Sequence, residues 1–239
     1  MLTALPSGSF DPTRLGHPES LWLNILSKAN SWSPAPGPLA VVSPHPDDEI
    51  LGAGGLIHEW VQRGHAVTII SVTDGEAAYP YPDSLGSLRI HELQCALRRL
   101  SPTYVPSVRL GIPDGQVSRC RHRLRHALAS LVTPGTTVVA PFEKDGHTDH
   151  DAIGEECVLL SKGMGLNLAR YPIWRWHHGN AQEMRSRRWG RFPLTFAARR
   201  AKKHAIECFA SQLTPAQANP IVPPHVLNYF ERPFEAFIL

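Results

Sequence analysis

Several features are scarce or absent in this 239-residue sequence, and each absence excludes a class of protein. No apolar run is long enough to cross a bilayer, so we expect no membrane span. The stretch MLTALPSGSFDPTRLGHPES lacks the basic start, the apolar segment and the small-residue cleavage site of a secretory signal. Together these absences predict a cytoplasmic protein.

Cysteine is also scarce, and its spacing excludes two common scaffolds. The four cysteines lie far apart along the chain without a C-x-x-C pair, at Cys95, Cys120, Cys157 and Cys208. This spacing is unlike that of a zinc ribbon or a disulfide framework. We therefore expect reduced and mostly buried thiols.

The glycine spacing of dinucleotide-binding proteins is missing as well. Gly52, Gly54 and Gly55 follow an acidic turn, but they do not form the pattern G-x-G-x-x-G. We therefore exclude a nicotinamide cofactor and attribute these glycines to the close packing of a helix.

The formal net charge of +3 is too small to indicate a nucleic-acid partner, and we expect none. Basic residues nevertheless concentrate in residues 170–203, where Glu183 is the only acid. Such a segment is either a solvated surface or an anion-binding surface. We favour the solvated surface, because runs of like charge are usually hydrated.

What the sequence does contain is a regular alternation of strand and helix patterns. Short apolar runs typical of buried parallel strands occupy residues 38–44, 65–75, 106–115 and 136–142. Helical patterns follow at residues 49–64, 84–100 and 121–132, and another helix begins around residue 149. This alternation predicts a Rossmann-like three-layer α/β sandwich with a mostly parallel sheet.

The same patterns suggest the domain organisation. Residues 1–38 are punctuated by proline, serine and glycine, and we expect an irregular N-terminal lead-in packed on the domain. Residues 39–239 are expected to form a single domain.

Two charged clusters, HPDDE at residues 45–49 and HTDH at residues 147–150, each follow a predicted strand. In parallel sheets, ligands bind beyond the carboxyl ends of the strands. The two clusters are therefore expected to converge there, although about a hundred residues separate them.

The residue types in these clusters match a hydrolytic metal site. Catalytic zinc takes three protein ligands from histidine and carboxylate and keeps one position for water. His45, Asp48 and His150 supply such a set, which suits Zn²⁺ or Fe²⁺. A row of three acids is costly to bury without positive charge, which also favours a metal ion.

Three further residues of the clusters have candidate catalytic roles. Asp47 is placed to act as a general base beside the metal. His147, when protonated, is placed to stabilise an oxyanion or the leaving group, and Asp149 to orient one of the imidazoles.

Each cluster alone also has a purely structural explanation. The segment PDDE is typical of a helix N-terminus, where the helix dipole favours acids, and histidine pairs are common on protein surfaces. Because both clusters end predicted strands of one sheet, their joint occurrence favours the metal site.

The motifs SPHPDDEILGAGG and GHTDHDA together resemble those of the PIG-L/LmbE family of zinc-dependent N-deacetylases. Between them, VTDGEAA, LRIHELQCALRRL and LGIPDG occur in the order that this family shows. KKHAIECFASQL and PPHVLNYFERPFEAFI also resemble the tail of bacterial members. The resemblance covers roughly residues 39–176.

This resemblance implies specific roles. His45, Asp48 and His150 would be the metal ligands. Asp47 would be the general base and later the acid, and His147 would stabilise the tetrahedral intermediate.

Arg89 and Asp114 would contact the sugar substrate. The implied reaction removes an acetyl group from an N-acetylglucosamine unit, free or in a glycoconjugate, and the implied fold is the layered α/β arrangement. Members of the family often form homo-oligomers, but nothing in this sequence gives the number of subunits.

Other functions remain open at this level. One is an amidase that cleaves a larger acyl or thiol conjugate, and another is a non-catalytic module that binds an anionic partner. The residues from Trp174 to His178 either stack against a sugar or pack a lid, and packing is favoured. His225 either reaches the pocket or belongs to a turn, and the turn is favoured.

Overall fold

The computed structural model describes residues 11–79, 84–215 and 218–239. The strands of these residues form one mixed sheet. They are β1 Asn30–Ser31, β2 Leu39–Ser43, β3 Val67–Ser71, β4 Ser107–Arg109, β5 Thr137–Pro141, β6 Asn167–Tyr171, β7 Trp189–Pro193 and β8 Phe234–Ile238.

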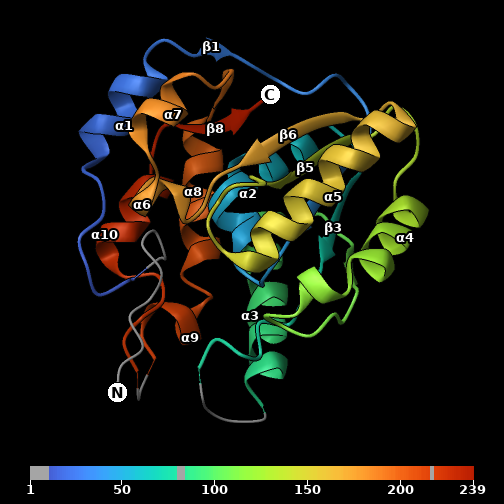
Figure 1. The fold of residues 1–239 in the computed structure, drawn as a ribbon, viewed down its shortest axis with the longest axis horizontal. Coiled ribbons are helices and arrows are strands. Elements are labelled where there is room, and N and C mark those ends of the chain that lie inside the picture. The colour runs from blue at the N-terminus through green and yellow to red at the C-terminus, as the bar shows by residue number, and fades with distance from the viewer. Residues whose placement is uncertain (1–10, 80–83, 216–217) are drawn as a thin grey trace.

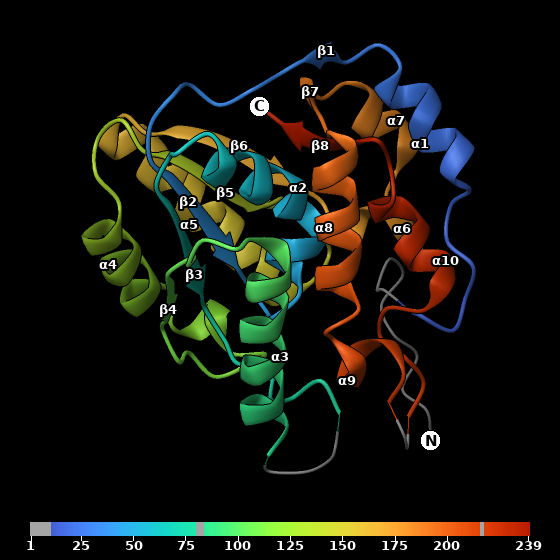
Figure 2. The ribbon, with the colours of Figure 1, turned by 180° about the vertical axis from the view of Figure 1, so that it is seen from behind.

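Helices cover both faces of this sheet (Figures 1 and 2). The α-helices are α1 Glu19–Leu26, α2 Asp48–Gln62, α3 Leu85–Leu100, α4 Arg121–Leu131, α5 Thr148–Met164, α6 Arg175–His178, α7 Ala181–Arg185, α8 Phe196–Ile206, α9 Ala210–Leu213 and α10 Pro224–Leu227. Two 3₁₀ turns, η1 Val117–Arg119 and η2 Asn228–Phe230, complete the described elements. Among the described helices, none combines the length and the apolar character that a membrane span requires.

The strand order is β1-β7-β8-β6-β5-β2-β3-β4. All paired strands run parallel except β8, which is antiparallel to β6 and β7. From β2 the chain proceeds to β3 and β4 on one side and later returns to β5 on the other side. The gap between β2 and β5 is therefore the topological switch point, where open parallel sheets bind their ligands.

Alternate residues of the central strands divide the interior into two apolar layers. In β2, Leu39 and Val41 join the core beneath α2, α3 and α8, and Ala40 and Val42 join the core beneath α4 and α5. Figure 1 shows α5 in front of the sheet, and Figure 2 shows α3 and α8 in front of its other face. The predicted three-layer α/β sandwich is confirmed.

The glycines of α2 allow the helix to pack closely. A Cβ atom on Gly52 would lie 2.3 Å from the Tyr171 ring, and one on Gly55 would lie 2.4 Å from Leu194. The packing role predicted for these two glycines is confirmed.

Residues before β2 are more regular than the sequence suggests. Within the expected irregular lead-in, α1 forms and buries Trp22, whose Nε1 donates to the Trp176 carbonyl at 2.6 Å. Strand β1 pairs with β7 at the sheet edge. The local sequence does not predict either element, because the partners that stabilise them lie more than a hundred residues away. The division at residue 38 stays a prediction.

The cysteines are free thiols, as expected, but only Cys157 is fully buried. Cys95 of α3 and Cys208, just after α8, have their Sγ atoms 3.0 Å apart. Two cysteines that are distant in sequence are thus neighbours in space.

Candidate active site

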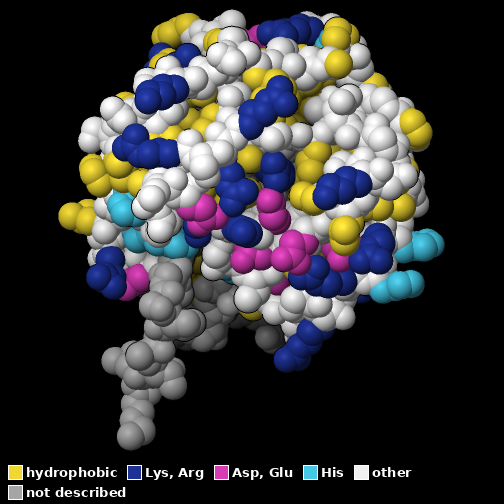
Figure 3. All heavy atoms as spheres, turned by 45° about the horizontal axis from the view of Figure 1, so that its top comes forward, with side chains coloured by type: hydrophobic (Ala, Val, Ile, Leu, Met, Phe, Trp, Pro, Cys, Tyr) yellow, Lys and Arg dark blue, Asp and Glu magenta, His cyan; other side chains and the backbone are white. Residues whose placement is uncertain are grey.

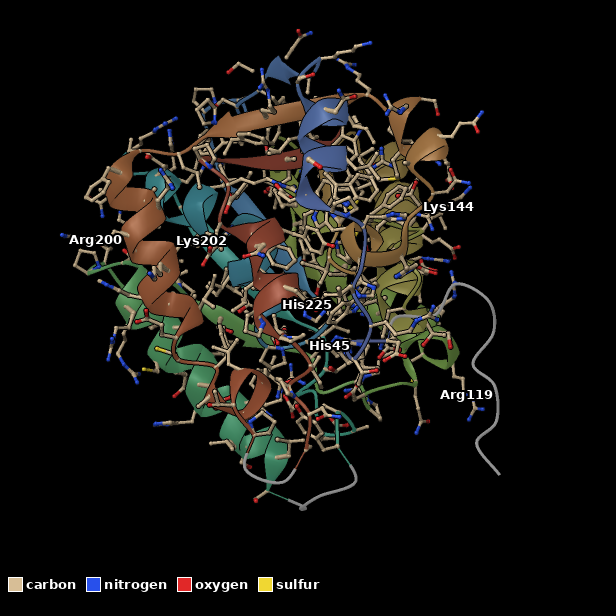
Figure 4. The ribbon with its side chains drawn as sticks, turned by 90° about the vertical axis from the view of Figure 1, so that its left-hand side faces the viewer. His45, Arg119, Lys144, Arg200, Lys202 and His225 are labelled. Atoms are coloured by element: carbon tan, nitrogen blue, oxygen red, sulfur yellow. The ribbon has the colours of Figure 1, made fainter. Side chains whose placement is uncertain are left out.

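Both charged clusters lie at the topological switch point. The first follows β2 and enters α2, and the second follows β5 and enters α5. Because β2 and β5 are neighbours in the sheet, their carboxyl ends bring His45 close to His147 and His150. The predicted convergence is confirmed, and Figure 4 shows His45 in the interior of the molecule.

Three donor atoms form a small triangle at the centre of the site. Nδ1 of His45 lies 3.3 Å from Oδ2 of Asp48 and 3.3 Å from Nε2 of His150. The same Asp48 oxygen lies 3.3 Å from Nε2 of His150. All three side chains are almost completely buried.

This triangle has the dimensions of one face of a tetrahedral metal site. Zinc bonds of about 2.0–2.1 Å to nitrogen and oxygen separate tetrahedral ligands by about 3.3–3.4 Å. Burial alone would lower the pKa of both imidazoles, but the surrounding carboxylates outweigh it: they raise the pKa of His45 well above its usual value and that of His150 to about 9. The pocket thus favours positive charge, and the residues present fit a divalent metal ion.

The ring of His45 is oriented from its other side. Its Nε2 lies 3.0 Å from Oδ1 of Asp114 and 3.4 Å from Oδ2 of Asp149. When Nδ1 binds a metal ion, Nε2 keeps the ring proton, because the carboxylates on that side only accept, and the lone pair of Nδ1 faces the triangle. Asp149 is held in turn by the backbone amides of Gly115 and Val117, at 2.7 and 3.2 Å.

Asp145 is a site residue that the sequence analysis missed. Its Oδ2 lies 2.9 Å from Nδ1 of His150, the ring nitrogen that faces away from the triangle. It stands two residues before His147, in the turn between β5 and α5. Its position in the sequence, just before His147 and His150, is the feature that could have identified it as a site residue.

Asp47 lies beside the triangle in a strained backbone conformation. Its φ angle is 138°, which makes it the only residue besides glycine with a positive φ among the described residues. Its Oδ2 lies 3.2 Å from Nη2 of Arg89, which also donates to the Pro46 carbonyl at 2.9 Å. Such a conformation costs about 1–3 kcal/mol and persists only where surrounding contacts enforce it.

The three consecutive acids occupy different environments. Burial raises the pKa of Asp47 to about 7 against the opposing charge of Arg89. For Asp48, burial is outweighed by His150 and His45, which lower its pKa. Glu49 contacts Ser43 at 2.6 Å, and burial raises its pKa to about 8. The three neighbouring acids therefore differ in pKa because their surroundings differ.

His147 lies next to both ligand histidines, with ring centroids 4.9 Å from His45 and 5.0 Å from His150. Its Nδ1 accepts the backbone N–H of Asp149 at 3.2 Å. Burial is the main cause that lowers its pKa to about 3. The ring is therefore neutral, and the protonated His147 expected from the sequence is wrong. Its one proton is on Nε2, which is left as a donor.

A cavity of about 470 Å³ opens over these residues. Its walls include the site residues His45, Asp47, Asp48, Arg89, Asp114 and His147 together with Tyr79, Trp174 and Gln212. Arg89 and Asp114, the predicted sugar contacts, thus line the cavity. Both are already engaged, Arg89 with Asp47 and Asp114 with His45.

The two tryptophans after β6 have different surroundings. Trp174 lines the cavity, and Trp176 packs in the core at 5.3 Å from the Trp22 ring. His225 contacts the Arg14 carbonyl through Nε2 at 3.1 Å.

The basic segment 170–203 is partly engaged within the protein. Its single acid, Glu183, pairs with both Arg175 and Arg187. Lys202 is buried against Glu235 at 2.7 Å, and Figure 4 shows Arg200 on the outer side of α8. On the face drawn in Figure 3, basic side chains are dispersed, with acidic side chains between several of them.

The fold resembles those of two solved structures. The conserved protein TT1542 from Thermus thermophilus aligns over 84% of this chain and 93% of its own, with a TM-score of 0.63 and 25% identity. N,N'-diacetylchitobiose deacetylase from Pyrococcus horikoshii aligns over 81% and 76%, with a TM-score of 0.55 and 22% identity. The second likeness concerns the fold alone.

The sequence comparisons match parts of the chain. A 1D-myo-inositol 2-acetamido-2-deoxy-alpha-D-glucopyranoside deacetylase from Corynebacterium efficiens is 37% identical over 73 residues, which cover 26% of this chain. The match spans about a quarter of that relative's length, 24%. Residues 40–160 match the model of the PIG-L family, described as GlcNAc-PI de-N-acetylase. Because this match spans about half of the chain and includes both histidine clusters, the protein belongs to the PIG-L family.

Proposed function

We propose that this protein is a metal-dependent hydrolase that removes the N-acetyl group from an N-acetylglucosamine-type sugar, giving a free amine and acetate. One observation carries the proposal. A triangle of donor atoms with edges of 3.3 Å lies at the cavity, and two of its residues, His45 and Asp48, line that cavity together with Asp47, a carboxylate outside the triangle.

His45, Asp48 and His150 would hold the ion through Nδ1, Oδ2 and Nε2. We propose zinc, since two imidazoles and one carboxylate leave a position for water, and ferrous iron suits the same ligands. When bound, such an ion polarises an amide carbonyl and makes water more acidic.

Asp47 is the residue that moves the proton. Its carboxylate would take a proton from the attacking water and later deliver it to the leaving nitrogen, because an amide anion is too poor a leaving group. Nη2 of Arg89 lies 3.2 Å from Oδ2 of Asp47 and holds this oxygen in place. This contact would keep the carboxylate aimed at the substrate.

His147 would donate from Nε2 to the acyl oxygen as negative charge develops there. Its Nδ1 is occupied by the Asp149 amide, so the ring has a fixed orientation and one available donor. Because the neutral ring already carries a proton on Nε2, His147 can donate this hydrogen bond without first being protonated.

The choice of an amino sugar draws on the named relatives and on the cavity. A volume of about 470 Å³ accommodates a sugar-sized ligand, and Tyr79 and Trp174 add aromatic surface to its walls. The relative from Corynebacterium efficiens is named for an N-acetylated glucosaminyl inositol.

The test is acetate release by metal-stripped protein with and without added zinc. The substrates are N-acetylglucosamine, N,N'-diacetylchitobiose and the inositol-linked sugar, with longer acyl chains as comparison. Asp47→Asn should abolish release and retain stoichiometric zinc, and His150→Ala should lose zinc. Glu155→Gln, an exposed acid of α5, is the matched control and should keep both.

Zinc-dependent acetate release from one substrate would support the reaction and identify its substrate class. Normal rates for Asp47→Asn would contradict the assigned base, and stoichiometric zinc in His150→Ala would contradict the ligand set. Release only from long acyl chains would favour an amidase of larger conjugates.

A further inference from the structure

The side chain of Asp145 makes four polar contacts from a completely buried position. Its Oδ1 accepts the backbone amides of Ile173 and Arg175, each at 3.0 Å, and its Oδ2 accepts the amide of Trp174 at 3.0 Å. The fourth contact is Nδ1 of His150, 2.9 Å from Oδ2. Buried polar atoms are stable only where hydrogen-bond partners satisfy them, and these donors satisfy both oxygens of Asp145.

These contacts connect two parts of the site that lie on different strands. His150 lies in α5, the helix after β5, and its Nε2 belongs to the donor triangle. Residues 173–175 follow the neighbouring strand β6. Trp174 forms part of the cavity wall, and its ring centroid lies 6.3 Å from that of His150. One side chain therefore contacts both a proposed ligand and the wall beside it.

We infer that Asp145 is a positioning residue: it fixes the ring of His150 for metal binding and anchors the Trp174 segment of the cavity wall. The inference rests on the proposed function for the metal role of His150. Since Nδ1 of His150 faces a carboxylate, it carries the proton and leaves Nε2 to bind the ion. Substitution of a residue in such a position commonly lowers metal affinity by about 10–100-fold.

The chemistry of an amide explains why Asp145→Asn is the informative variant. All four neighbours of Asp145 are N–H donors when His150 binds a metal through Nε2. An asparagine of nearly the same shape offers only one oxygen, so its NH₂ group must face at least one of these donors. The side chain then either turns away from His150 or releases backbone amides of the wall.

The experiment measures zinc affinity by competition with a chelator, together with hydrogen exchange of the backbone amides of residues 173–175. The variants are Asp145→Asn and, as control, Glu92→Gln. Glu92 of α3 is also buried and accepts a backbone amide, that of Ser211 at 2.8 Å. Its other oxygen accepts the Ser211 hydroxyl at 2.6 Å, so this carboxylate ties α3 to α9 and not to the donor triangle.

We expect Asp145→Asn to weaken zinc binding at least tenfold and to speed exchange at residues 173–175, with Glu92→Gln unchanged in both. Unchanged zinc affinity in Asp145→Asn would overturn the inference, as would an equal loss in both variants, which would indicate general destabilisation. If the wild-type protein binds no zinc, the proposed function fails; exchange in metal-free protein then still decides whether Asp145 anchors the wall.

Discussion

Arg89 and Asp47 are 42 residues apart in sequence, and their side chains meet at 3.2 Å in the wall of the cavity. The same guanidinium donates to the carbonyls of Pro46 and Gly75, at 2.9 and 3.1 Å. Gly75 leaves room for this group, because a Cβ atom there would lie 2.3 Å from Nη1. Arg89 of α3 thus holds Asp47, the acid just before α2.

This relationship predicts the effect of Arg89→Lys. A lysine keeps the charge but cannot donate to three oxygens in the same plane. A misplaced Asp47 should lower kcat on the order of 100-fold, with zinc affinity unchanged. Steady-state kinetics and chelator competition measure the two quantities.

Arg109→Lys is the matched control, since Arg109 forms an exposed pair with Asp74 at 2.7 Å. We expect it to change kcat little. A kcat of Arg89→Lys equal to that of the wild type would show that Asp47 needs no such support.

The positive φ of Asp47 predicts an unusual order of stabilities. Because glycine adopts φ near 138° without strain, Asp47→Gly should be more stable than Asp47→Ala by about 1–2 kcal/mol. Both lack the carboxylate, so neither should release acetate. Urea unfolding measures the difference between the two variants.

At an exposed position of α5, the order of stability between the glycine and alanine variants should reverse. At Glu155, alanine should be more stable than glycine by about 1 kcal/mol, the ordinary helix preference. Equal stability of the two Asp47 variants would be evidence against strain at that position.

Metal binding should stabilise the fold, because the donor triangle joins the turns after β2 and β5. Zinc at a hundred times its dissociation constant adds about 2.7 kcal/mol. For a domain of this size that corresponds to a rise in Tm of about 5–10 °C. Differential scanning fluorimetry of metal-stripped protein measures it, with Glu155→Gln as the unchanged control and His150→Ala expected to show no rise.

The neighbouring thiols of Cys95 and Cys208 should form a disulfide by exchange with a low-molecular-weight disulfide. The two protein thiols give up their protons and electrons, and the reagent leaves as two thiols. Burial raises the pKa of Cys208 to about 12, so exchange at neutral pH should be slow. Peptide mass spectrometry without reduction identifies the bond.

Cys95→Ser should block this product. In this variant Cys157 should react with an alkylating reagent only after unfolding, since that thiol is buried. A product that joins Cys208 to any other cysteine would contradict the observed proximity.

The sequence by itself determined the layers and the place of the site. Apolar runs and helical patterns specify local structure directly, and the acids and histidines after β2 and β5 must lie at one edge once those strands are parallel neighbours. For this reason His45, Asp48 and His150 were predicted together, and the structure places their donor atoms 3.3 Å apart.

Only the tertiary structure decided the contacts that cross between elements. The pairing of Arg89 with Asp47, the contact of Asp145 with His150, the anchoring of α1 through Trp22 and the meeting of Cys95 with Cys208 all join residues whose local patterns are ordinary. Local sequence carries the preference of a residue for a helix, a strand or a turn. Which polar atom it meets depends on the packing of distant segments, because hydrogen bonds and ion pairs act only over a few ångströms.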